Sequence, residues 1–258
     1  MELNKIYCES NVDTMARMPD GFVALTVTSP PYDNLRTYNG FEWNFGEVVS
    51  ALYRVTKQGG VVVWVVGDAT IDGDETGTSF RQALGFKNIG FRLHDTMIWQ
   101  KPNPVPTQHV RYETAFEYMF VFSKGKPSVT NILRERSKSG AVERVGHRAS
   151  GGNGHQKIAE RIYVGGEDKI RHNIWNIPIA VPELKGHPAP FPQTLVADHI
   201  QSWSNEGDLV YDPFCGSGTV PKMAHILRRN WIGSEISAEY VDLANKRLDP
   251  YLAQSSLF

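Results

Sequence analysis

Cysteine is almost missing from this sequence of 258 residues, which contains only Cys8 and Cys215. The two stand far apart and form no Cys-x-x-Cys or Cys/His ligand pattern. Such a sequence offers neither a disulfide framework nor the ligand set of a zinc site, so we expect no bound metal. Sparse, unpatterned cysteine is typical of proteins that work in a reducing compartment.

The sequence also lacks a net charge and a long apolar run. Its 27 Lys and Arg against 28 Asp and Glu give a formal net charge of −1, so any DNA-binding surface must be local. The longest apolar run, Val61–Val66, is far too short to span a bilayer. Residues Met1–Lys5 lack the basic start and apolar run of a signal peptide. We therefore expect a cytoplasmic protein without a membrane partner.

What the sequence does contain is an alternation of apolar strands and amphipathic helices, in a length that suits one α/β domain with a small insertion. The run Val61–Val66 is typical of a central parallel strand that is covered on both faces. Residues 45–57 place apolar side chains at helical spacing and stop at Gly59 and Gly60. The same periodicities predict strands at 22–28, 94–99, 116–122, 208–211 and 231–234, and helices that begin at 79 or span 194–204, 220–229 and 239–248.

Residues 124–172 differ in character from the rest of the chain. Apolar runs shorten, glycines cluster, and eleven Lys and Arg stand against five Asp and Glu, which gives this stretch a net charge of +6. One interpretation is a solvated, partly disordered loop. The other is an electropositive segment that approaches phosphates.

Near the C-terminus, a strand, a glycine turn, a helix and a second strand that ends in an acid form one βαβ unit. Gly216 and Gly218 permit a close approach of the backbone to a ligand. Glu235 follows Gly218 by 17 residues, close to the spacing of a carboxylate that binds both hydroxyls of a ribose. A structural glycine turn would explain the glycines but not an acid at the end of each strand. The turn reads Asp212-Pro213-Phe214-Cys215-Gly216-Ser217-Gly218-Thr219.

Two details of this turn favour S-adenosylmethionine over NAD. Pro221 occupies the place of the third glycine in the dinucleotide pattern Gly-x-Gly-x-x-Gly. The carboxylate of Asp212 disfavours a pyrophosphate but suits a ligand with an amino group and a positive sulfonium. Only 39 residues follow Thr219, too few to build a nucleotide-binding sheet. The other strands must come from the N-terminal part, so the motifs of this fold occur in permuted order.

The segment Thr28-Ser29-Pro30-Pro31-Tyr32 ends the predicted strand at 22–28, and open α/β sheets bind their ligands at that edge. The two prolines fix the backbone and turn its carbonyls into rigid acceptors. Ser29 adds a hydroxyl and Tyr32 an aromatic face. Together they can accept hydrogen bonds from an NH2 group while stacking on the ring that carries it. For two prolines alone, a strand terminator would be the better interpretation, but the cofactor turn in the same chain favours a catalytic loop.

These groups suit methyl transfer to the exocyclic amine of cytosine or adenine. The lone pair of that nitrogen is delocalised into the ring, and acceptors placed out of the ring plane free it for in-line attack on the methyl carbon. The transfer needs no covalent intermediate, so we expect Cys215 only to pack within its turn. Inside a duplex the amine is out of reach, so the base must be flipped out.

Taken together, the two motifs resemble the amino-methylating DNA methyltransferases of bacteria and phages, and their order resembles the β group, in which the catalytic motif precedes the cofactor motif. The resemblance covers most of the chain. It implies an α/β fold with an open, mostly parallel Rossmann-like sheet, helices on both faces and one antiparallel strand. It also implies S-adenosyl-L-methionine as cofactor and double-stranded DNA as substrate. The Thr-Ser-Pro-Pro-Tyr form is similar to the N4-cytosine subset, and the catalytic residues that it implies are Ser29, Pro30, Pro31 and Tyr32.

The resemblance also implies the cofactor contacts. The turn Asp212–Thr219 and the acid Glu235 match the motifs of the family. Phe191 lies in a segment similar to the one that closes over the methionine part of the cofactor. The family often has Gly-Asp after its first strand, where the Asp meets the adenine amino group. This chain departs from that pattern, so Ser10 and Asn11 are the candidates for the adenine contact.

The family keeps its target-recognition region where this chain carries its basic stretch. We therefore expect a catalytic half at 1–123, an inserted recognition region at 124–172 and a cofactor-binding half at 173–258. Trp99–Asn103 resembles a family strand and loop near the flipped base. The basic residues that are candidates for contacts with phosphates or guanine edges are Arg134, Arg136, Lys138, Arg144 and Arg148.

Partners and alternative functions stay open at this point. A cognate restriction endonuclease and a second copy of the chain are candidate partners besides DNA. The nearest alternative is N6-adenine methylation. Asp-Pro-Pro-Tyr is more usual in N6-adenine enzymes, but the first residue of the motif does not separate the two groups strictly. Methylation of RNA or of a protein glutamine is a second one, although those enzymes usually carry the cofactor motif first. A DNA-binding module without activity would not need Ser29, Tyr32 and Asp212 together.

Overall fold

The computed structural model describes residues 1–31, 43–104, 111–136, 143–148, 159–164, 168–179 and 191–255. The chain divides into two compact units. Unit 1 comprises Met1–Asn131 and Asn173–Phe258, and unit 2 comprises Ile132–His172. Among the described residues, no helix is long and apolar enough to cross a membrane.

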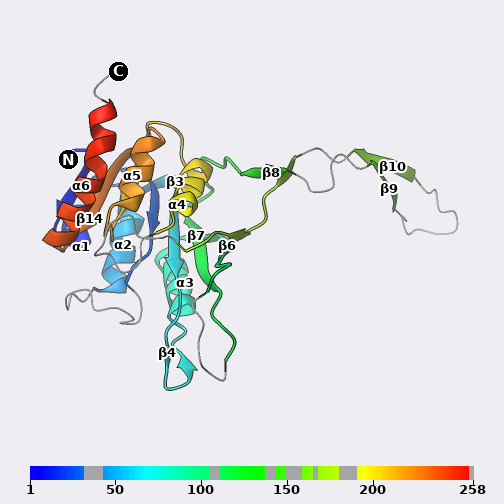
Figure 1. Cartoon of the computed structure of the whole chain (residues 1–258), viewed down its shortest axis with the longest axis horizontal. Helices are drawn as coiled ribbons and strands as arrows, with labels where there is room; N and C mark the ends of the chain where they lie inside the picture. The colour runs from blue at the N-terminus through cyan, green and yellow to red at the C-terminus, as the bar shows by residue number, and fades with distance from the viewer. Residues whose placement is uncertain are drawn as a thin grey trace. The chain divides into compact units, whose positions relative to one another are not determined.

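The centre of unit 1 is a sheet of eight strands in the order β1-β14-β13-β2-β3-β7-β6-β12 (Figure 1). All neighbouring strands pair in parallel except at β7, which is antiparallel to both β3 and β6. The predicted open, mostly parallel sheet with one antiparallel strand is therefore confirmed. The strands are β1 (Lys5–Cys8), β2 (Val23–Thr28), β3 (Thr56–Val66), β6 (Arg92–Gln100), β7 (Phe116–Ser123), β12 (Ile174–Asn176), β13 (Leu209–Asp212) and β14 (Asn230–Glu235).

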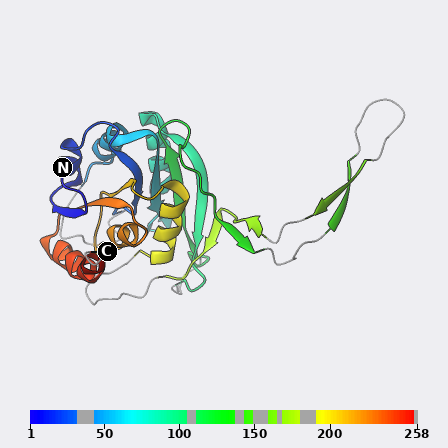
Figure 2. The ribbon, with the colours of Figure 1, turned by 90° about the horizontal axis from the view of Figure 1, so that it is seen from above.

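Helices cover both faces of the sheet (Figure 2). Helices α1, α2 and α3 pack against one another in one layer, and α4, α5 and α6 form the other. A short hairpin of β4 (Thr70–Ile71) and β5 (Asp74–Glu75) follows β3. The helices are α1 (Asn11–Ala16), α2 (Phe45–Val55), α3 (Thr78–Ile89), α4 (Gln193–Trp203), α5 (Thr219–Ile226) and α6 (Ala238–Ser255).

The core forms because the central strands are apolar along their whole length. All six residues of β2 are buried, as is every residue of Val61–Val66 in β3. Trp64 lies at the middle of an aromatic cluster, and its indole N–H donates to Gln82 at 2.7 Å. Phe86 of α3 stacks on Phe122 of β7 with ring centroids 4.1 Å apart. A rigid sheet thus supports the loops at its edges.

The boundary between α2 and β3 differs from the prediction. The helix ends at Val55 and the strand begins at once, so Gly59 and Gly60 lie within β3 and not at a helix end. The pairing of β2 with β3 shifts register there, which marks a bulge. Gly59 has φ +78°, and a Cβ on it would lie 2.9 Å from that of Ser128. These glycines accordingly serve a close backbone approach.

Two helix ends also differ from their predicted positions. Helix α5 stops at Ile226, short of the predicted Arg229, and Arg228 adopts a left-handed conformation with φ +60°. Helix α6 continues to Ser255, past the predicted end at Leu248. The predicted end preceded Pro250, which lies inside the observed helix.

The sheet has a topological switch point between β13 and β2. From β13 the chain passes through α5 to β14 on one side, and from β2 it passes through α2 to β3 on the other. In open α/β sheets, ligands bind beside the carboxyl ends of the strands at such a point. Although β2 comes early in the chain and β13 late, they are neighbours in the sheet. The permuted order that the sequence predicts is confirmed.

Unit 2 consists of short antiparallel pairs. Strand β8 (Arg134–Arg136) pairs with β11 (Asp168–Ile170), and β9 (Glu143–Arg148) pairs with β10 (Ala159–Val164). Neither interpretation of the basic stretch predicted these pairs. The compact unit begins at Ile132, so residues 124–131 of the predicted recognition region belong to unit 1.

Candidate active site

The predicted site residues follow the carboxyl ends of adjacent parallel strands. Ser29, Pro30 and Pro31 follow β2, and the turn Asp212–Thr219 begins at the end of β13. Glu235 ends β14. Because these strands run in parallel, their carboxyl ends lie at one edge of the sheet. The fold therefore brings the catalytic and cofactor motifs together, while Tyr32 lies outside the described residues.

Asp212 is the buried acid of this edge, with 3% of its surface exposed. Its Oδ1 accepts two hydrogen bonds, from the Thr28 hydroxyl at 2.7 Å and from the Phe214 N–H at 3.1 Å. Burial raises the pKa of Asp212 to about 7, the two donors oppose that rise, and the charge of Glu235 adds to it. Among the described residues, Oδ2 has no hydrogen-bond partner. A carboxylate oxygen without a donor, on a side chain that is otherwise buried, is suited to an incoming ammonium group.

Glu235 is the second acid, and it is only partly buried. Its Oε2 accepts the Gly216 N–H at 2.8 Å and its Oε1 accepts the Ser237 N–H at 2.9 Å. Desolvation raises the pKa of Glu235, and the backbone N–H donors oppose it. Each carboxylate oxygen has a further lone pair, so Glu235 can still accept the two hydroxyls of a ribose.

The turn between β13 and α5 requires glycine at two positions. Gly216 has φ +51° and Gly218 has φ +76°, in the left-handed region that side chains disfavour. A Cβ on Gly218 would also lie 2.9 Å from the Cβ of Ala244 in α6. The turn is therefore pressed closely against that helix.

Cys215 packs inside this turn. Its side chain is buried, and a Cβ on Gly233 of β14 would lie 2.7 Å from its Sγ. Its N–H donates to the Ser234 carbonyl at 2.9 Å. Burial raises the pKa of the Cys215 thiol well above its ordinary value, because the negative thiolate is disfavoured there. A thiol in this state is a poor nucleophile.

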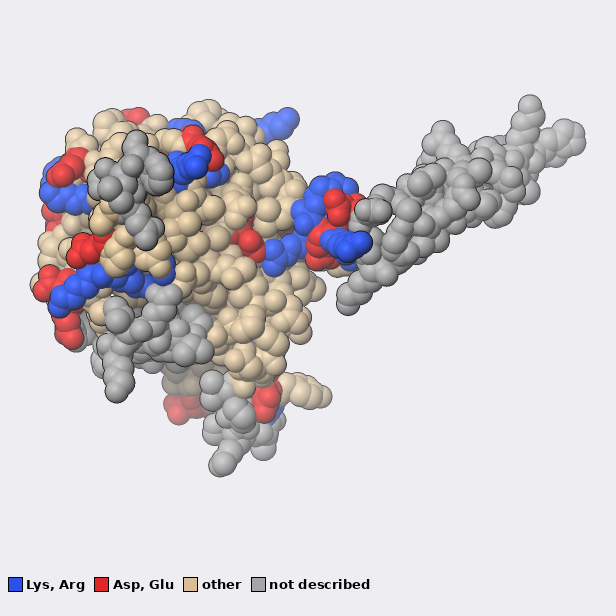
Figure 3. Space-filling model, turned by 45° about the horizontal axis from the view of Figure 1, so that its top comes forward, with Lys and Arg blue, Asp and Glu red and all other residues tan. Residues whose placement is uncertain are grey.

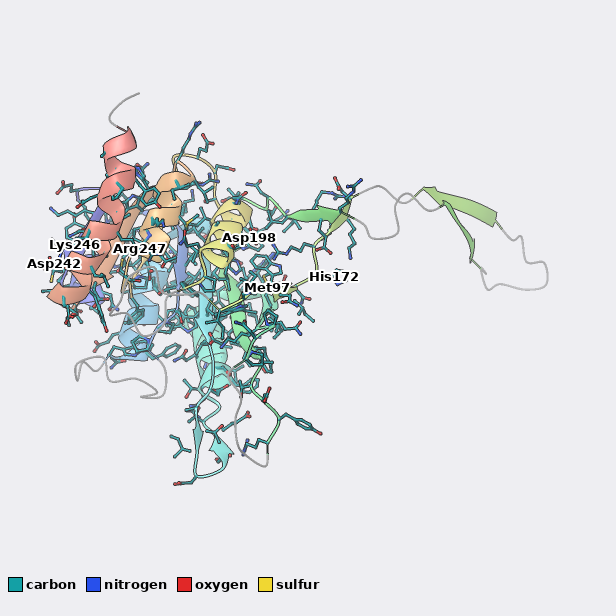
Figure 4. The ribbon with its side chains drawn as sticks, in the orientation of Figure 1. Met97, His172, Asp198, Asp242, Lys246 and Arg247 are labelled. Atoms are coloured by element: carbon teal, nitrogen blue, oxygen red, sulfur yellow. The ribbon has the colours of Figure 1, made fainter. Side chains whose placement is uncertain are left out.

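Arg247 of α6 is a functional candidate that the sequence reasoning missed. Its Nη1 donates to the Ser217 carbonyl at 3.1 Å and to the Thr219 hydroxyl at 2.9 Å, and it lies 3.4 Å from the Ser217 hydroxyl. Figure 4 shows Arg247 on the side of α6 toward α5, whereas Asp242 and Lys246 point away. Arg247 thus fixes both ends of the Gly218 bend, and no motif in the sequence signals this contact.

Ser10 and Asn11 lie at the end of β1 and engage in intramolecular hydrogen bonds. The Ser10 hydroxyl accepts the Val12 N–H at 3.2 Å and caps α1. The Asn11 side chain donates to the Pro213 carbonyl at 3.1 Å and so braces the cofactor turn. Phe191, half-buried, lies just before α4. Contacts of these residues with a cofactor stay predictions.

The hydrogen-bond acceptors of the catalytic loop fall into two groups, those with a donor and those without one. The indole N–H of Trp43 donates to the Pro31 carbonyl at 3.1 Å. In the described part of the chain, neither the Ser29 hydroxyl nor the Pro30 carbonyl has a hydrogen-bond partner. Ser29 is half-buried. Among the described residues, the acceptors of this loop that have no donor at all, and are thus fully available to a substrate amine, are therefore those of Ser29 and Pro30.

Trp43 also joins the two motifs through its ring. It packs edge-on against Phe214 of the cofactor turn, with ring centroids 5.0 Å apart, and lies 6.1 Å from Trp64 of the core. Like Arg247, Trp43 was not found by sequence reasoning. A tryptophan outside any motif carries no signal until the fold places it.

Near the end of β6, Lys101 and Glu117 form an ion pair at 2.5 Å, with 16% and 14% of their side chains exposed. The Lys101 ammonium lies 5.0 Å from the centre of the Trp99 ring. The Trp99 indole N–H donates to the Ile177 carbonyl at 2.7 Å. This segment, which resembled a loop near the flipped base, is thus rigidly held.

In unit 2, Arg134 and Arg136 are exposed on β8. The described part of this unit carries charges of both signs, as Figure 3 shows, and Lys169 pairs with Glu135 at 3.0 Å. Lys138 lies outside the described residues, and Arg144 and Arg148 are described only by their place on β9. The DNA contacts of these arginines and of Lys138 stay predictions.

Comparisons with known proteins agree on one family. The DNA methylase family of N6 and N4 methyltransferases matches residues 23–246. The orphan methyltransferase M.BamHII of Bacillus amyloliquefaciens is 51% identical over 243 residues, which cover 90% of this chain and 91% of that protein. The PvuII DNA methyltransferase, described as cytosine-N4-specific, has the same fold, with a TM-score of 0.71, 22% identity and coverage of 94% of this chain and 85% of its own. A Thermus thermophilus protein, solved in complex with S-adenosyl-L-methionine, has a TM-score of 0.65, 23% identity and coverage of 96% and 95%.

Proposed function

Because the chain belongs to the DNA methylase family of N6 and N4 methyltransferases, we propose that it methylates the exocyclic N4 amine of a flipped cytosine in duplex DNA. The observation that carries this proposal is the meeting of two motifs at the switch point of the sheet. Acceptors of Ser29 and Pro30 that have no partner among the described residues lie just after the end of β2, and the acids Asp212 and Glu235 end the next two strands of the sheet.

S-adenosyl-L-methionine is the cofactor of this family. When bound, it supplies an electrophilic methyl group on a positive sulfonium. The two acids fit it: Oδ2 of Asp212, which has no partner among the described residues, suits the amino group of the methionine part, and Glu235 suits the ribose hydroxyls. Phe191 and Phe214 would bury its apolar parts.

On the substrate side, the Ser29 hydroxyl and the Pro30 carbonyl would each accept an N–H of the amine. Trp43 holds the Pro31 carbonyl in place, so the loop keeps its shape when the base enters. We assign to Tyr32 the stacking contact with the flipped ring. The amine nitrogen would bond directly to the methyl carbon while the bond from that carbon to the sulfonium sulfur breaks, so that the cofactor would leave as a neutral thioether. The methylated nitrogen would then lose a proton to solvent, and no covalent bond to the protein would form.

Cytosine is favoured over adenine by the serine at position 29. The likeness to the PvuII enzyme, whose description names cytosine N4, supports the same choice. The family includes N6-adenine enzymes as well, so adenine is the second candidate. The basic unit 2 would contact phosphates and base edges, and a partner endonuclease and a homodimer stay proposals.

A transfer assay with labelled cofactor tests the proposal. Purified chain is incubated in parallel with duplex DNA, RNA and a protein mixture. Label is expected in DNA alone in the wild type, and in none of the three for Ser29→Ala or Asp212→Ala. Label that appears only in RNA or protein contradicts a DNA methyltransferase.

A further inference from the structure

Thr28 is the last residue of β2 and directly precedes the Ser-Pro-Pro segment. Its side chain does not join the acceptors of the catalytic loop. The hydroxyl donates instead to Oδ1 of Asp212 at 2.7 Å, across the switch point between β2 and β13. Both residues are buried, with 0% and 3% exposed. The two ends of this hydrogen bond are 184 positions apart in the sequence.

We propose that Thr28 is a positioning residue of the cofactor site, whose hydroxyl orients the Asp212 carboxylate toward the amino group of the cofactor. The inference rests on the proposed function, because it takes Asp212 as a cofactor ligand. It divides the Thr-Ser-Pro-Pro-Tyr segment by role: the threonine serves the cofactor, while the serine after it serves the base.

The geometry explains how the hydroxyl orients the acid. Oδ1 receives both donors, Thr28 from β2 and the Phe214 N–H from the turn, which fixes the rotation of the carboxylate. Oδ2 has no partner among the described residues and remains available to the cofactor. Removing the hydroxyl would leave a single donor and a carboxylate free to rotate.

The same hydrogen bond acts on the charge of Asp212. Burial raises the pKa of Asp212 to about 7, and the Thr28 hydroxyl is the stronger of the two donors that oppose this rise. Among the described residues, the titratable groups that interact with the acid are Glu235 at the end of β14 and, on its own strand and turn, Tyr211 and Cys215. Strand β2 brings no titratable group. Without the hydroxyl, Asp212 would become protonated at a higher pH.

Thr26 provides a matched control on the same strand. It lies two residues before Thr28, on the same face, and is also 0% exposed. Its hydroxyl has no hydrogen-bond partner in the described structure. Thr26→Val thus removes a buried hydroxyl from β2 without touching Asp212.

The test measures S-adenosyl-L-methionine binding by calorimetry between pH 6 and 9, on the full chain and its variants Thr28→Val, Thr28→Ser and Thr26→Val. We expect Thr28→Val to weaken binding about tenfold at pH 7, a difference of about 1.4 kcal/mol. The pH at which affinity is half lost should move upward. Thr28→Ser and Thr26→Val should keep the wild-type profile. The ionisation of S-adenosyl-L-methionine itself is the same for all variants, so it cancels when their affinities are compared at one pH.

Two outcomes overturn the inference: a Thr28→Val profile equal to that of the wild type, or a loss of affinity that is the same at every pH. Thermal melting of each variant controls for folding, and Thr28→Ala replaces Thr28→Val if the latter does not fold. A wild type that binds no S-adenosyl-L-methionine would instead contradict the proposed function. Wild-type binding that Asp212→Asn abolishes and Thr28→Val leaves unchanged would overturn only the role of Thr28.

Discussion

Asp212 is a carboxyl group in the interior of the molecule, and its burial raises its pKa from 3.8 to about 7. Between these two pH values the folded chain binds more protons than the unfolded chain. Without cofactor, the free energy of unfolding therefore falls as the pH rises from about 4 to about 7. A shift of this size corresponds to a loss of the order of 4 kcal/mol. The acid is retained at a cost in stability, which is expected of a ligand-binding group.

The substitution Asp212→Asn tests this cost. The amide oxygen can still accept the donors from Thr28 and Phe214, but the side chain no longer ionises. We expect the melting temperature of Asp212→Asn to exceed that of the wild type at pH 8, and the difference to shrink toward pH 4.5. Cofactor binding should be lost. A variant that melts below the wild type at pH 8 would show that the buried charge stabilises the fold.

Sequence reasoning at this scale found the two acids but not their partners. Asp212 and Glu235 stand at the ends of recognisable strands, so their shared edge could be predicted. Thr28, Trp43 and Arg247 act through side-chain contacts with residues far away in the sequence. Such contacts depend on how the elements pack, and a single sequence contains no record of that.

At the scale of elements, the C-terminal helix α6 supports the cofactor turn. Ala244 leaves no room for a side chain at Gly218, and Arg247 donates hydrogen bonds on both sides of that glycine. The turn therefore depends on a helix that is separated from it by two elements, α5 and β14. This dependence gives α6 a role in binding although none of its residues belongs to a motif.

We predict that Arg247→Met weakens S-adenosyl-L-methionine binding several-fold. It removes charge-assisted hydrogen bonds, typically worth about 1.5–3 kcal/mol each, from a partly exposed site where solvent reduces that value. The control is Lys246→Met, an exposed neighbour on the same helix. Titration calorimetry compares the two. Equal affinities would mean that α6 only packs against the turn.

Most elements could be predicted because their periodicity is strong. The core strand Val61–Val66 and the helix before it were both expected, yet the helix ends at Val55 and the strand starts at Thr56. A Gly-Gly pair signals a helix end and a bulge equally well, and only the pairing of β3 with its neighbours decides between them. In unit 2, short polar strands have no apolar alternation from which to predict them.

At the scale of the whole molecule, unit 2 is an insertion whose two ends lie side by side. The Arg171 N–H donates to the Leu133 carbonyl at 3.0 Å, where the chain leaves and re-enters the unit. In unit 1, the flanking Asn131 and Asn173 are anchored by hydrogen bonds to Ser202 and Thr96. A short linker can therefore join the flanks.

We predict that replacing residues 132–172 by a short Gly-Ser linker leaves cofactor binding intact and abolishes specific DNA binding. The segment contains nine Lys and Arg against five Asp and Glu, so its loss should also flatten the salt dependence of DNA binding. Calorimetry with cofactor and filter binding of DNA at several salt concentrations measure both. Unchanged DNA affinity and salt dependence would place the DNA-binding surface in unit 1.

The most direct measurement of the central claim is the identity of the methylated base. The substrate is genomic DNA from a host without methyltransferases, because such DNA contains every short recognition sequence in unmethylated form. It is incubated with the purified chain and S-adenosyl-L-methionine and hydrolysed to nucleosides, which are identified by mass spectrometry. Asp212→Ala serves as the inactive control. We predict N4-methylcytosine in the wild-type reaction and none in the control. N6-methyladenine as the sole product would contradict the choice of cytosine, and 5-methylcytosine would contradict direct transfer to an exocyclic amine.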